Sequence, residues 1–236
     1  MKKFYLLLFG FILVLTSNAA DKTLYETTFA KGKWNPNDWQ MTKSSRWSYV
    51  GKWIQHDKFI ANAVPKNASD KELQSKRAGE TYTVMLLKNK ITGPCTITCT
   101  MEFDYRMAPG IIITLKDPVK IKENQELRDH LEFILYDLGV NIWHHYFENG
   151  KQKWRKNFYL TDKKSFGPKK PYTVTMKLSQ TSKGPYIEVI AGGNVCGYYE
   201  PLLFKQDYQI GIVGCEGLNR FYDFKVTTPT KTKQKK

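Results

Sequence analysis

Apolar and polar positions alternate with a period of two along most of the chain from residue 23 onward. Each run is short, rich in β-branched or aromatic residues, and ended by Gly, Pro, Asn or Asp at intervals typical of β-sandwiches. The pattern predicts strands at residues 25–29, 47–49, 53–56, 82–87, 96–105, 110–115, 130–136, 141–147, 152–158, 172–178, 186–191, 195–199, 209–215 and 221–227. Residues 67–77 and 119–128 are charged and lack a wide apolar stripe, so we expect each to be a loop or a short helix.

This number of strands, about fourteen, is more than one open sheet holds without curling or splitting. We therefore expect two antiparallel sheets packed face to face. Asn149-Gly150 and Gly192-Gly193 supply the positive φ angles that two-residue hairpin turns need, which supports antiparallel pairing. The predicted fold class is all-β, a two-sheet antiparallel jelly-roll sandwich that forms a single domain over residues 21–228.

The first twenty residues have the layout of a secretory signal peptide. Two lysines precede an apolar stretch over residues 4–15, and small residues at 17–19 precede a cleavage site after Ala19 or Ala20. We therefore expect an exported protein, periplasmic or extracellular. The longest later apolar run, residues 110–115, has the length of a strand, so no transmembrane segment is predicted after the signal peptide.

Charge is the outlier of the composition. The 236 residues include 37 Lys and Arg against 22 Asp and Glu, which gives a net charge of +15. Export would remove two lysines, and the basic tail at residues 229–236, which we expect to be disordered, holds four more. The basic residues of the folded body are scattered between strands, which argues against nucleic acid as a partner. The remaining excess favours an acidic saccharide.

The four cysteines are Cys95, Cys99, Cys196 and Cys215. Alternation places Cys95 and Cys99 on the same core-facing side of one strand, about 13 Å apart and beyond disulfide reach. Bridges to Cys196 or Cys215 stay open as alternatives, and buried free thiols are the state that we expect. The cysteines are not clustered at zinc-ligand spacing, so no metal site is predicted from them.

The last third of the chain contains a recognisable series of segments. In order, they are Pro171-Tyr172, Gly192-Gly193-Asn194, Tyr208 to Gly217, and Phe221-Tyr222-Asp223-Phe224. This series resembles concanavalin A-like lectin/glucanase domains and, among them, the laminin-G-like bacterial modules that include the 3-keto-disaccharide hydrolase family. The resemblance implies a concanavalin A-like jelly roll over most of the chain that follows the signal peptide.

A sharper match is the strand His130-Leu-Glu132-Phe-Ile134-Leu-Tyr-Asp137. It resembles the family's Gly-x-Glu-x-Gln-(Ile/Val)-x-Asp strand, with Glu132 and Asp137 kept, His130 in place of Gly and Ile134 in place of Gln. Upstream, Arg106 precedes a Gly-Ile strand where the family has an arginine. The resemblance implies a hydrolase that acts on a saccharide, with Glu132 and Asp137 as candidate catalytic residues.

Glu132 is the first candidate for chemistry. Alternation places it on the polar face of its strand, and the polar face of a curved sheet in such a sandwich is the usual groove for a sugar. A carboxylate there hydrogen-bonds hydroxyl groups or acts as an acid or base. The alternative is an exposed strand glutamate paired with a lysine on the neighbouring strand.

The next predicted strand carries His144 and His145, which point to opposite faces. A tight turn at residues 137–139 pairs this strand with the Glu132 strand, so one of the histidines would form a proton-transfer pair with Glu132. The face with Trp143 and His145 is the better groove lining, although the register is open. Each histidine has a structural role as its alternative. Adjacent histidines point apart and are no chelate by themselves, so no metal and no cofactor is predicted, with Ca²⁺ left open.

Aromatic and basic residues complete the set of candidates. Trp143, Tyr146 and Trp154 suit stacking on sugar rings, whereas core packing is the role that we expect for Trp47 and Trp53. Side chains that suit an anionic sugar are Arg106, Lys116, Arg155 and Arg220.

Missing motifs narrow the chemistry further. The chain has no Glu-x-Asp-x-x-Glu strand, no Gly-x-Ser-x-Gly elbow and no phosphate-cradling glycine loop. The leading hypothesis is an exported carbohydrate-active protein, glycoside hydrolase-like, that acts on an ordinary or oxidised saccharide. The alternatives are a non-catalytic carbohydrate-binding module, a polysaccharide lyase acting on an acidic glycan, and an adhesion domain that recognises protein.

Overall fold

The computed structural model describes residues 21–69, 81–104, 107–161 and 166–229. The predicted signal peptide, most of the 67–77 segment, Arg106 and residues 230–236 of the tail lie outside the described residues. The regular secondary structure of the described chain is almost all strand, with one short 3-10 helix, η1 (Pro36–Asp38). No helix within it has the length and apolarity needed to cross a bilayer.

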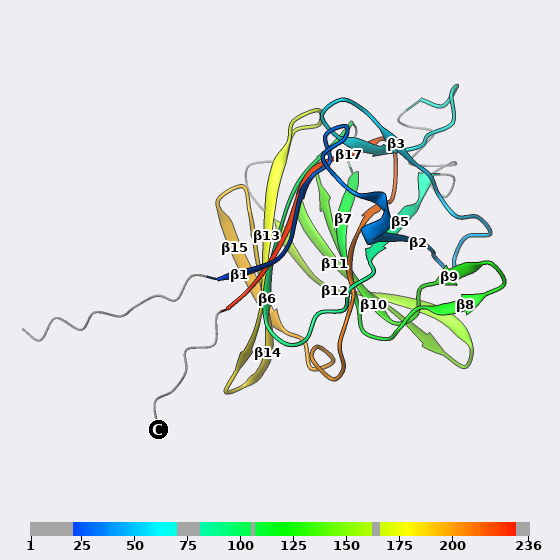
Figure 1. The fold of residues 1–236 in the computed structure, drawn as a ribbon. Helices are drawn as coiled ribbons and strands as arrows, with labels where there is room; N and C mark the ends of the chain where they lie inside the picture. Colours follow the sequence, from blue (N-terminus) through cyan, green and yellow to red (C-terminus); the bar gives the residue numbers. More distant parts are fainter. Residues whose placement is uncertain (1–20, 70–80, 105–106, 162–165, 230–236) are drawn as a thin grey trace, which may run out of the picture.

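The first sheet contains eight strands. Their order is β15 (Asn194–Tyr199), β14 (Gly184–Ala191), β13 (Tyr172–Thr181), β6 (Cys95–Phe103), β17 (Asn219–Thr228), β4 (Ile60–Asn62) and β3 (Trp53–Gln55), with β1 (Lys22–Thr28) paired to β17. Figure 1 shows β1 and β17, the first and last strands, side by side. The two ends of the domain therefore close on the same sheet.

The second sheet contains nine strands. Their order is β12 (Lys151–Thr161), β11 (Gly139–Glu148), β10 (His130–Tyr136), β7 (Met107–Thr114), β16 (Ile210–Gly214), β5 (Thr83–Leu87), β2 (Trp39–Lys43), β9 (Asn124–Glu126) and β8 (Val119–Ile121). The β2–β9 pair is parallel, and the other strand pairs of the described chain are antiparallel. The predicted all-β sandwich of two sheets is confirmed.

The tight turns have the backbone that their sequences predict. Asn149 and Gly150 have φ angles of 50° and 74° between β11 and β12, and Gly192 and Gly193 have 58° and 82° between β14 and β15. Two successive positive φ angles match the right-handed twist of the strands that flank a two-residue turn. These hairpins fix the register of the strands on either side.

Two local predictions are wrong. Residues 119–128 form the hairpin of β8 and β9 rather than a loop or helix, with Lys122 at a φ of 53° in the turn. Their short apolar alternation, Val119 and Ile121, is sufficient for a two-stranded edge. Residues 47–49 form no strand. They belong to a loop, and its Trp47 and Tyr49 pack on the outer face of the nine-stranded sheet.

The core lies between the two sheets. In β10, Leu131, Phe133 and Leu135 point into it, as period-two alternation predicts. Cys95 and Cys99 of β6 are buried in the same core, and all four cysteines are free thiols. The predictions for the cysteines of β6 are therefore confirmed.

A second apolar cluster lies on the opposite face of the nine-stranded sheet. Its buried members alternate with core residues along β5, β7, β10 and β16 and include Val84, Ile112, Ile134 and Val213. The face that we expected to be a polar groove is thus mostly apolar. The 44–52 loop covers part of it, and its polar groups are concentrated in one place.

Candidate functional site

Strand pairing brings three functional side chains to one point on the outer face of the nine-stranded sheet. His130 and Glu132 are two residues apart on β10 and therefore share a face. In the β10–β11 register, His130 lies opposite His145 and Glu132 lies opposite Trp143. The hairpin thus combines two residues close in sequence with a third from the neighbouring strand.

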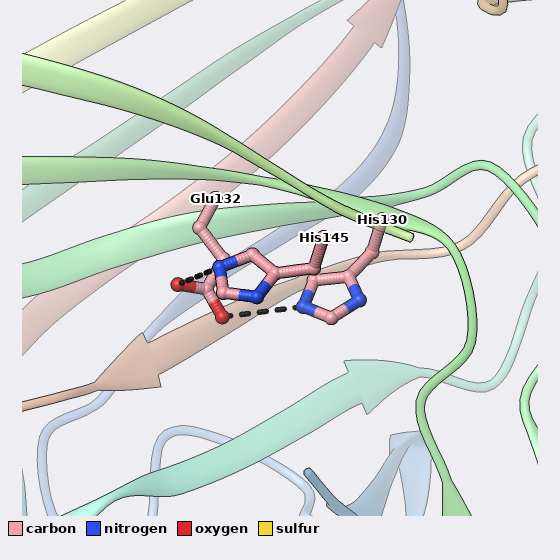
Figure 2. A group of neighbouring side chains, drawn as sticks. All are labelled: His130, Glu132 and His145. Atoms are coloured by element: carbon pink, nitrogen blue, oxygen red, sulfur yellow. Dashed lines mark hydrogen bonds and ion pairs between the residues drawn. The ribbon is translucent and has the colours of Figure 1, made fainter. Parts of the chain in front are cut away.

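The Glu132 carboxylate lies between the two imidazole rings (Figure 2). Its Oε1 is 3.2 Å from Nε2 of His130, and its Oε2 is 3.2 Å from Nε2 of His145. The rings stack with centroids 4.7 Å apart and planes 4° from parallel. The hydroxyl of Tyr82 donates a hydrogen bond to Oε1. We refer to His130, Glu132 and His145 as the Glu132 cluster.

The Glu132 cluster is buried. His130, Glu132 and His145 are 0%, 3% and 2% exposed. Burial alone would raise the pKa of Glu132, but His145 and His130 hold that pKa well below its usual range. Burial and the nearby Glu132 carboxylate raise the pKa of Tyr82 well above its ordinary value. Glu132 is therefore an anion in the interior, and Tyr82 stays a hydrogen-bond donor.

The outward-facing nitrogen of each ring also has a contact. Nδ1 of His130 is 2.5 Å from the backbone oxygen of Arg128. Nδ1 of His145 is 3.4 Å from the side-chain amide of Gln152, which in turn contacts the Ser45 hydroxyl. Both rings are thus held with Nε2 directed at the carboxylate.

A cleft of about 230 Å³ opens above the Glu132 cluster. It is lined by Arg46, Trp47, Tyr82, Glu132, Ile134, Asn141, Trp143, His145, Trp154, Cys215 and Glu216. The guanidinium of Arg46 lies 5.2 Å from the ring centroid of Trp47 and 4.8 Å from that of Trp154. We call this the Glu132 cleft.

Two polar atoms of the cleft lining are buried without a hydrogen-bond partner among the described residues. They are the indole nitrogen of Trp47, a donor, and the side-chain oxygen of Asn141, an acceptor. Buried polar groups are normally satisfied. A donor and an acceptor left open in one cleft suit a ligand that carries hydroxyl groups.

Four of the residues singled out from the sequence lie in this cleft: Glu132, His145, Trp143 and Trp154. His144, Tyr146 and Arg155 belong to the opposite face of the sheet, since residues on a strand alternate. His144 is buried there, and burial together with Arg155 lowers its pKa to about 4. Trp47, for which core packing was predicted, packs against the second apolar cluster and also lines the cleft.

The remaining candidates lie elsewhere. Asp137 is in the turn after β10 and does not line the cleft. Lys116 does not line it either and forms an ion pair with Asp129 at 2.8 Å. Arg220 is paired with Glu102 and Asp104. Arg106 lies outside the described residues. Trp53 packs against Phe221 with ring centroids 5.4 Å apart, as predicted for a core tryptophan.

Several residues of the site were not selected from the sequence. They are Arg46, Trp47, Tyr82, His130, Cys215 and Glu216. One signal was available, because His130 lies two residues before Glu132 on the same predicted strand face. The others reach the cleft from a loop or a distant strand, which local patterns do not reveal.

The Glu132 cluster also has the composition of a metal site. One ligand atom from each of its three members lies within 4.8 Å of the others, and it is the one such group of three in the described part of the chain. Adjacent His144 and His145 do not share a site, as alternation predicts; the second imidazole comes from His130.

No family model matches the chain, and no curated protein matches its sequence. Solved structures do match its fold. The carbohydrate-binding module CBM66 from Bacillus subtilis has a TM-score of 0.50 at 10% identity, over 79% of this chain and 99% of that one. The GlcNAcα1-4Gal-releasing endo-β-galactosidase from Clostridium perfringens has a TM-score of 0.58 at 6% identity, over 92% and 65%. The κ-carrageenase from Pseudoalteromonas carrageenovora, in complex with an oligotetrasaccharide of κ-carrageenan, has 0.56 at 9% identity, over 92% and 98%.

Identities of this size establish the fold alone. The matched proteins are carbohydrate-binding modules and glycoside hydrolases of jelly-roll architecture. The chain therefore has the jelly-roll fold that its sequence predicts.

Proposed function

We propose that this protein is carbohydrate-active, that it binds a saccharide in the Glu132 cleft, and that it acts there as a glycoside hydrolase-like enzyme. The observation that carries the proposal is a buried, ionised carboxylate held between two imidazoles at the floor of a tryptophan-lined cleft. Saccharide sites combine flat aromatic faces with a few placed polar groups, and this cleft has both.

The walls of the cleft suit a sugar ring. Trp143 and Trp154 offer apolar faces on the neighbouring strands β11 and β12. The open donor of Trp47 and the open acceptor of Asn141 suit the hydroxyl groups around such a ring. Trp154 is 53% exposed, so part of its ring is accessible to a ligand.

The floor of the cleft supplies the reactive groups. Glu132 and His145 are the pair that we assign to hydrogen bonding and proton transfer at the saccharide. Glu216 is a second carboxylate in the lining, and glycoside hydrolysis ordinarily uses two. The resemblance of the His130–Asp137 strand to the 3-keto-disaccharide hydrolases supports an oxidised saccharide as the substrate class.

Two further features bear on the location of the protein and on the charge of its ligand. The predicted signal peptide supports export to the periplasm or beyond, where glycans are available. One cation, Arg46, lines the cleft, and the Lys156 ammonium lies 5.5 Å from the ring centroid of Trp143, another lining residue. They support an acidic saccharide among the candidate ligands.

The test compares the wild type with Glu132→Gln, which keeps the size of the side chain and removes its charge. Turnover is measured on keto-glycosides, neutral oligosaccharides and uronate polymers, and binding by calorimetry. We expect the variant to lose turnover by more than about 100-fold while binding remains measurable. If the wild-type protein turns over none of these substrate classes, the proposed enzymatic activity is ruled out.

A non-catalytic binding module is the second candidate. Its support is the structural likeness to CBM66, because the match covers 99% of that module. The same experiment separates the two, because a binding module would show saccharide affinity in the wild type with no turnover. Protein that binds no saccharide in a glycan array, while its fold is intact by circular dichroism, would contradict both.

A further inference from the structure

The Glu132 cluster has a second feature that acid–base chemistry does not require: its three side chains converge like the ligands of one ion. We propose that His130, Glu132 and His145 bind a single divalent transition-metal ion at the floor of the Glu132 cleft. The inference rests on the proposed function in one respect, since it places the ion where the saccharide would bind.

Two nitrogen–oxygen distances within the cluster suit ligands of one ion. Nε2 of His130 and Nε2 of His145 each lie 3.2 Å from a carboxylate oxygen of Glu132, and one donor atom from each residue lies within 4.8 Å of the others. Ligands bound at about 2.1 Å and at tetrahedral or right angles are about 3.0–3.4 Å apart. The nitrogen–oxygen separations fall in that interval. The stacked rings present both Nε2 atoms on the side of the carboxylate (Figure 2).

The contacts around the cluster leave room for a cation at its centre. Nδ1 of His130 faces the Arg128 carbonyl oxygen, which only accepts, so Nδ1 carries a proton and Nε2 is the ring nitrogen left to bind an ion. A metal ion bound there would balance the charge of a carboxylate that is 3% exposed.

The outer contacts are those that support metal ligands. Ligating histidines almost always make a hydrogen bond through the other ring nitrogen, which fixes the tautomer and the ring orientation. His130 does so to the Arg128 carbonyl. Tyr82 fixes Oε1 of Glu132 by a hydrogen bond. Two of the three proposed ligands, His130 and Glu132, are therefore oriented before an ion arrives.

The donor set selects the class of ion. Two imidazoles and one carboxylate suit zinc and its first-row neighbours, whereas Ca²⁺ prefers six or more oxygen ligands. Three protein ligands leave coordination positions open for water or a substrate oxygen. Glu132 and His145 line the cleft, so the open positions face the space that we assign to the saccharide.

The experiment uses purified protein without a histidine tag, treated with a chelator and then dialysed. Zn²⁺ and Ca²⁺ are titrated separately by calorimetry, and Co²⁺ is followed by visible absorption as an independent report on imidazole ligation. We expect one Zn²⁺ per chain with a Kd below about 1 μM and no comparable binding of Ca²⁺. Absence of one-to-one Zn²⁺ binding to the wild type, or equal affinity for Ca²⁺, overturns the proposal.

The variants map the ligands. His130→Gln, Glu132→Gln and His145→Gln should each weaken Zn²⁺ binding by more than about 100-fold. The matched control is His144→Gln, a buried histidine next to His145 that points to the opposite face. It should retain wild-type affinity. A loss in His144→Gln equal to that in His145→Gln contradicts the assignment.

Two further measurements keep the outcome clear. The thermal midpoint of each variant is recorded with and without Zn²⁺. If Glu132→Gln does not fold, Glu132→Asp replaces it, because this variant keeps the charge and shortens the side chain. Saccharide binding is measured on the same samples. Saccharide binding without metal binding overturns this inference and leaves the proposed function standing. Metal binding by a protein that binds no saccharide supports this inference and contradicts the proposed function.

Discussion

The six tryptophans divide equally between two clefts of similar volume. The Glu132 cleft, about 230 Å³, is lined by Trp47, Trp143 and Trp154, and a second cleft, about 250 Å³, is lined by Trp34, Trp39 and Trp53. Their remaining linings differ. The first contains Arg46, Glu132, His145 and Glu216, whereas the second contains Lys52 as its one ionisable residue beside Pro36, Met41, Gly51 and Met85.

The tryptophans of the second cleft pack edge-on against core rings. The Trp39 ring centroid is 5.3 Å from that of Phe224, and Trp53 is 5.4 Å from Phe221. In the Glu132 cleft, the described contacts of Trp154 include a cation, Arg46, and half of the side chain is exposed. Aromatic lining alone therefore does not identify a binding site. A buried carboxylate with two imidazoles beneath the aromatic rings does distinguish one cleft from the other.

Trp39→Ala should have the largest effect on stability. The side chain is 5% exposed, and its indole nitrogen donates to the Tyr25 hydroxyl at 2.9 Å. Removing a buried tryptophan leaves a cavity and costs about 3–5 kcal/mol of the free energy of unfolding. Urea denaturation followed by circular dichroism measures this loss. A loss below about 1 kcal/mol would mean that the second cleft is not part of the core.

The fold was predictable because its signals are local. Alternation along β10 places Leu131, Phe133 and Leu135 on one face and Glu132 on the other without any knowledge of neighbouring strands. The Asn149-Gly150 turn predicts the hairpin of β11 and β12 in the same way. Both signals depend on the period of the strand or on two turn residues, and neither needs a long-range contact.

The composition of the site depends on contacts between distant segments. His130 meets His145 only through the β10–β11 register, which the sequence left open between two alternatives. Tyr82, the residue before β5, contacts Glu132 from fifty residues earlier in the chain, and Trp47 lies on a loop that alternation predicted to be a strand. Such contacts follow from the folded topology, so local patterns found one histidine of the cluster and missed the other.

Trp154→Ala should separate binding from stability. The side chain is 53% exposed, so the free energy of unfolding should change by no more than about 0.5 kcal/mol. Affinity for an oligosaccharide that the wild type binds in a glycan array should fall about tenfold, because a stacking face at the cleft is lost. Calorimetry measures the affinity. Trp34→Ala is the matched control and should leave it unchanged; equal losses in both variants would remove the distinction between the clefts.

Arg46→Gln should have the smallest effect and should report on the charge of the ligand. The guanidinium lies between the rings of Trp47 and Trp154 at the cleft, where it would contact an anionic group. For an acidic oligosaccharide we expect affinity to fall roughly fivefold at low salt, with a smaller difference at high salt because the charges are screened. Affinity for a neutral oligosaccharide should change less. The matched control is Lys52→Gln in the second cleft, which removes the same charge away from Glu132. If Lys52→Gln weakens binding as much as Arg46→Gln, the preference reflects the net charge of the whole protein, and the Glu132 cleft has no cation of its own for the ligand.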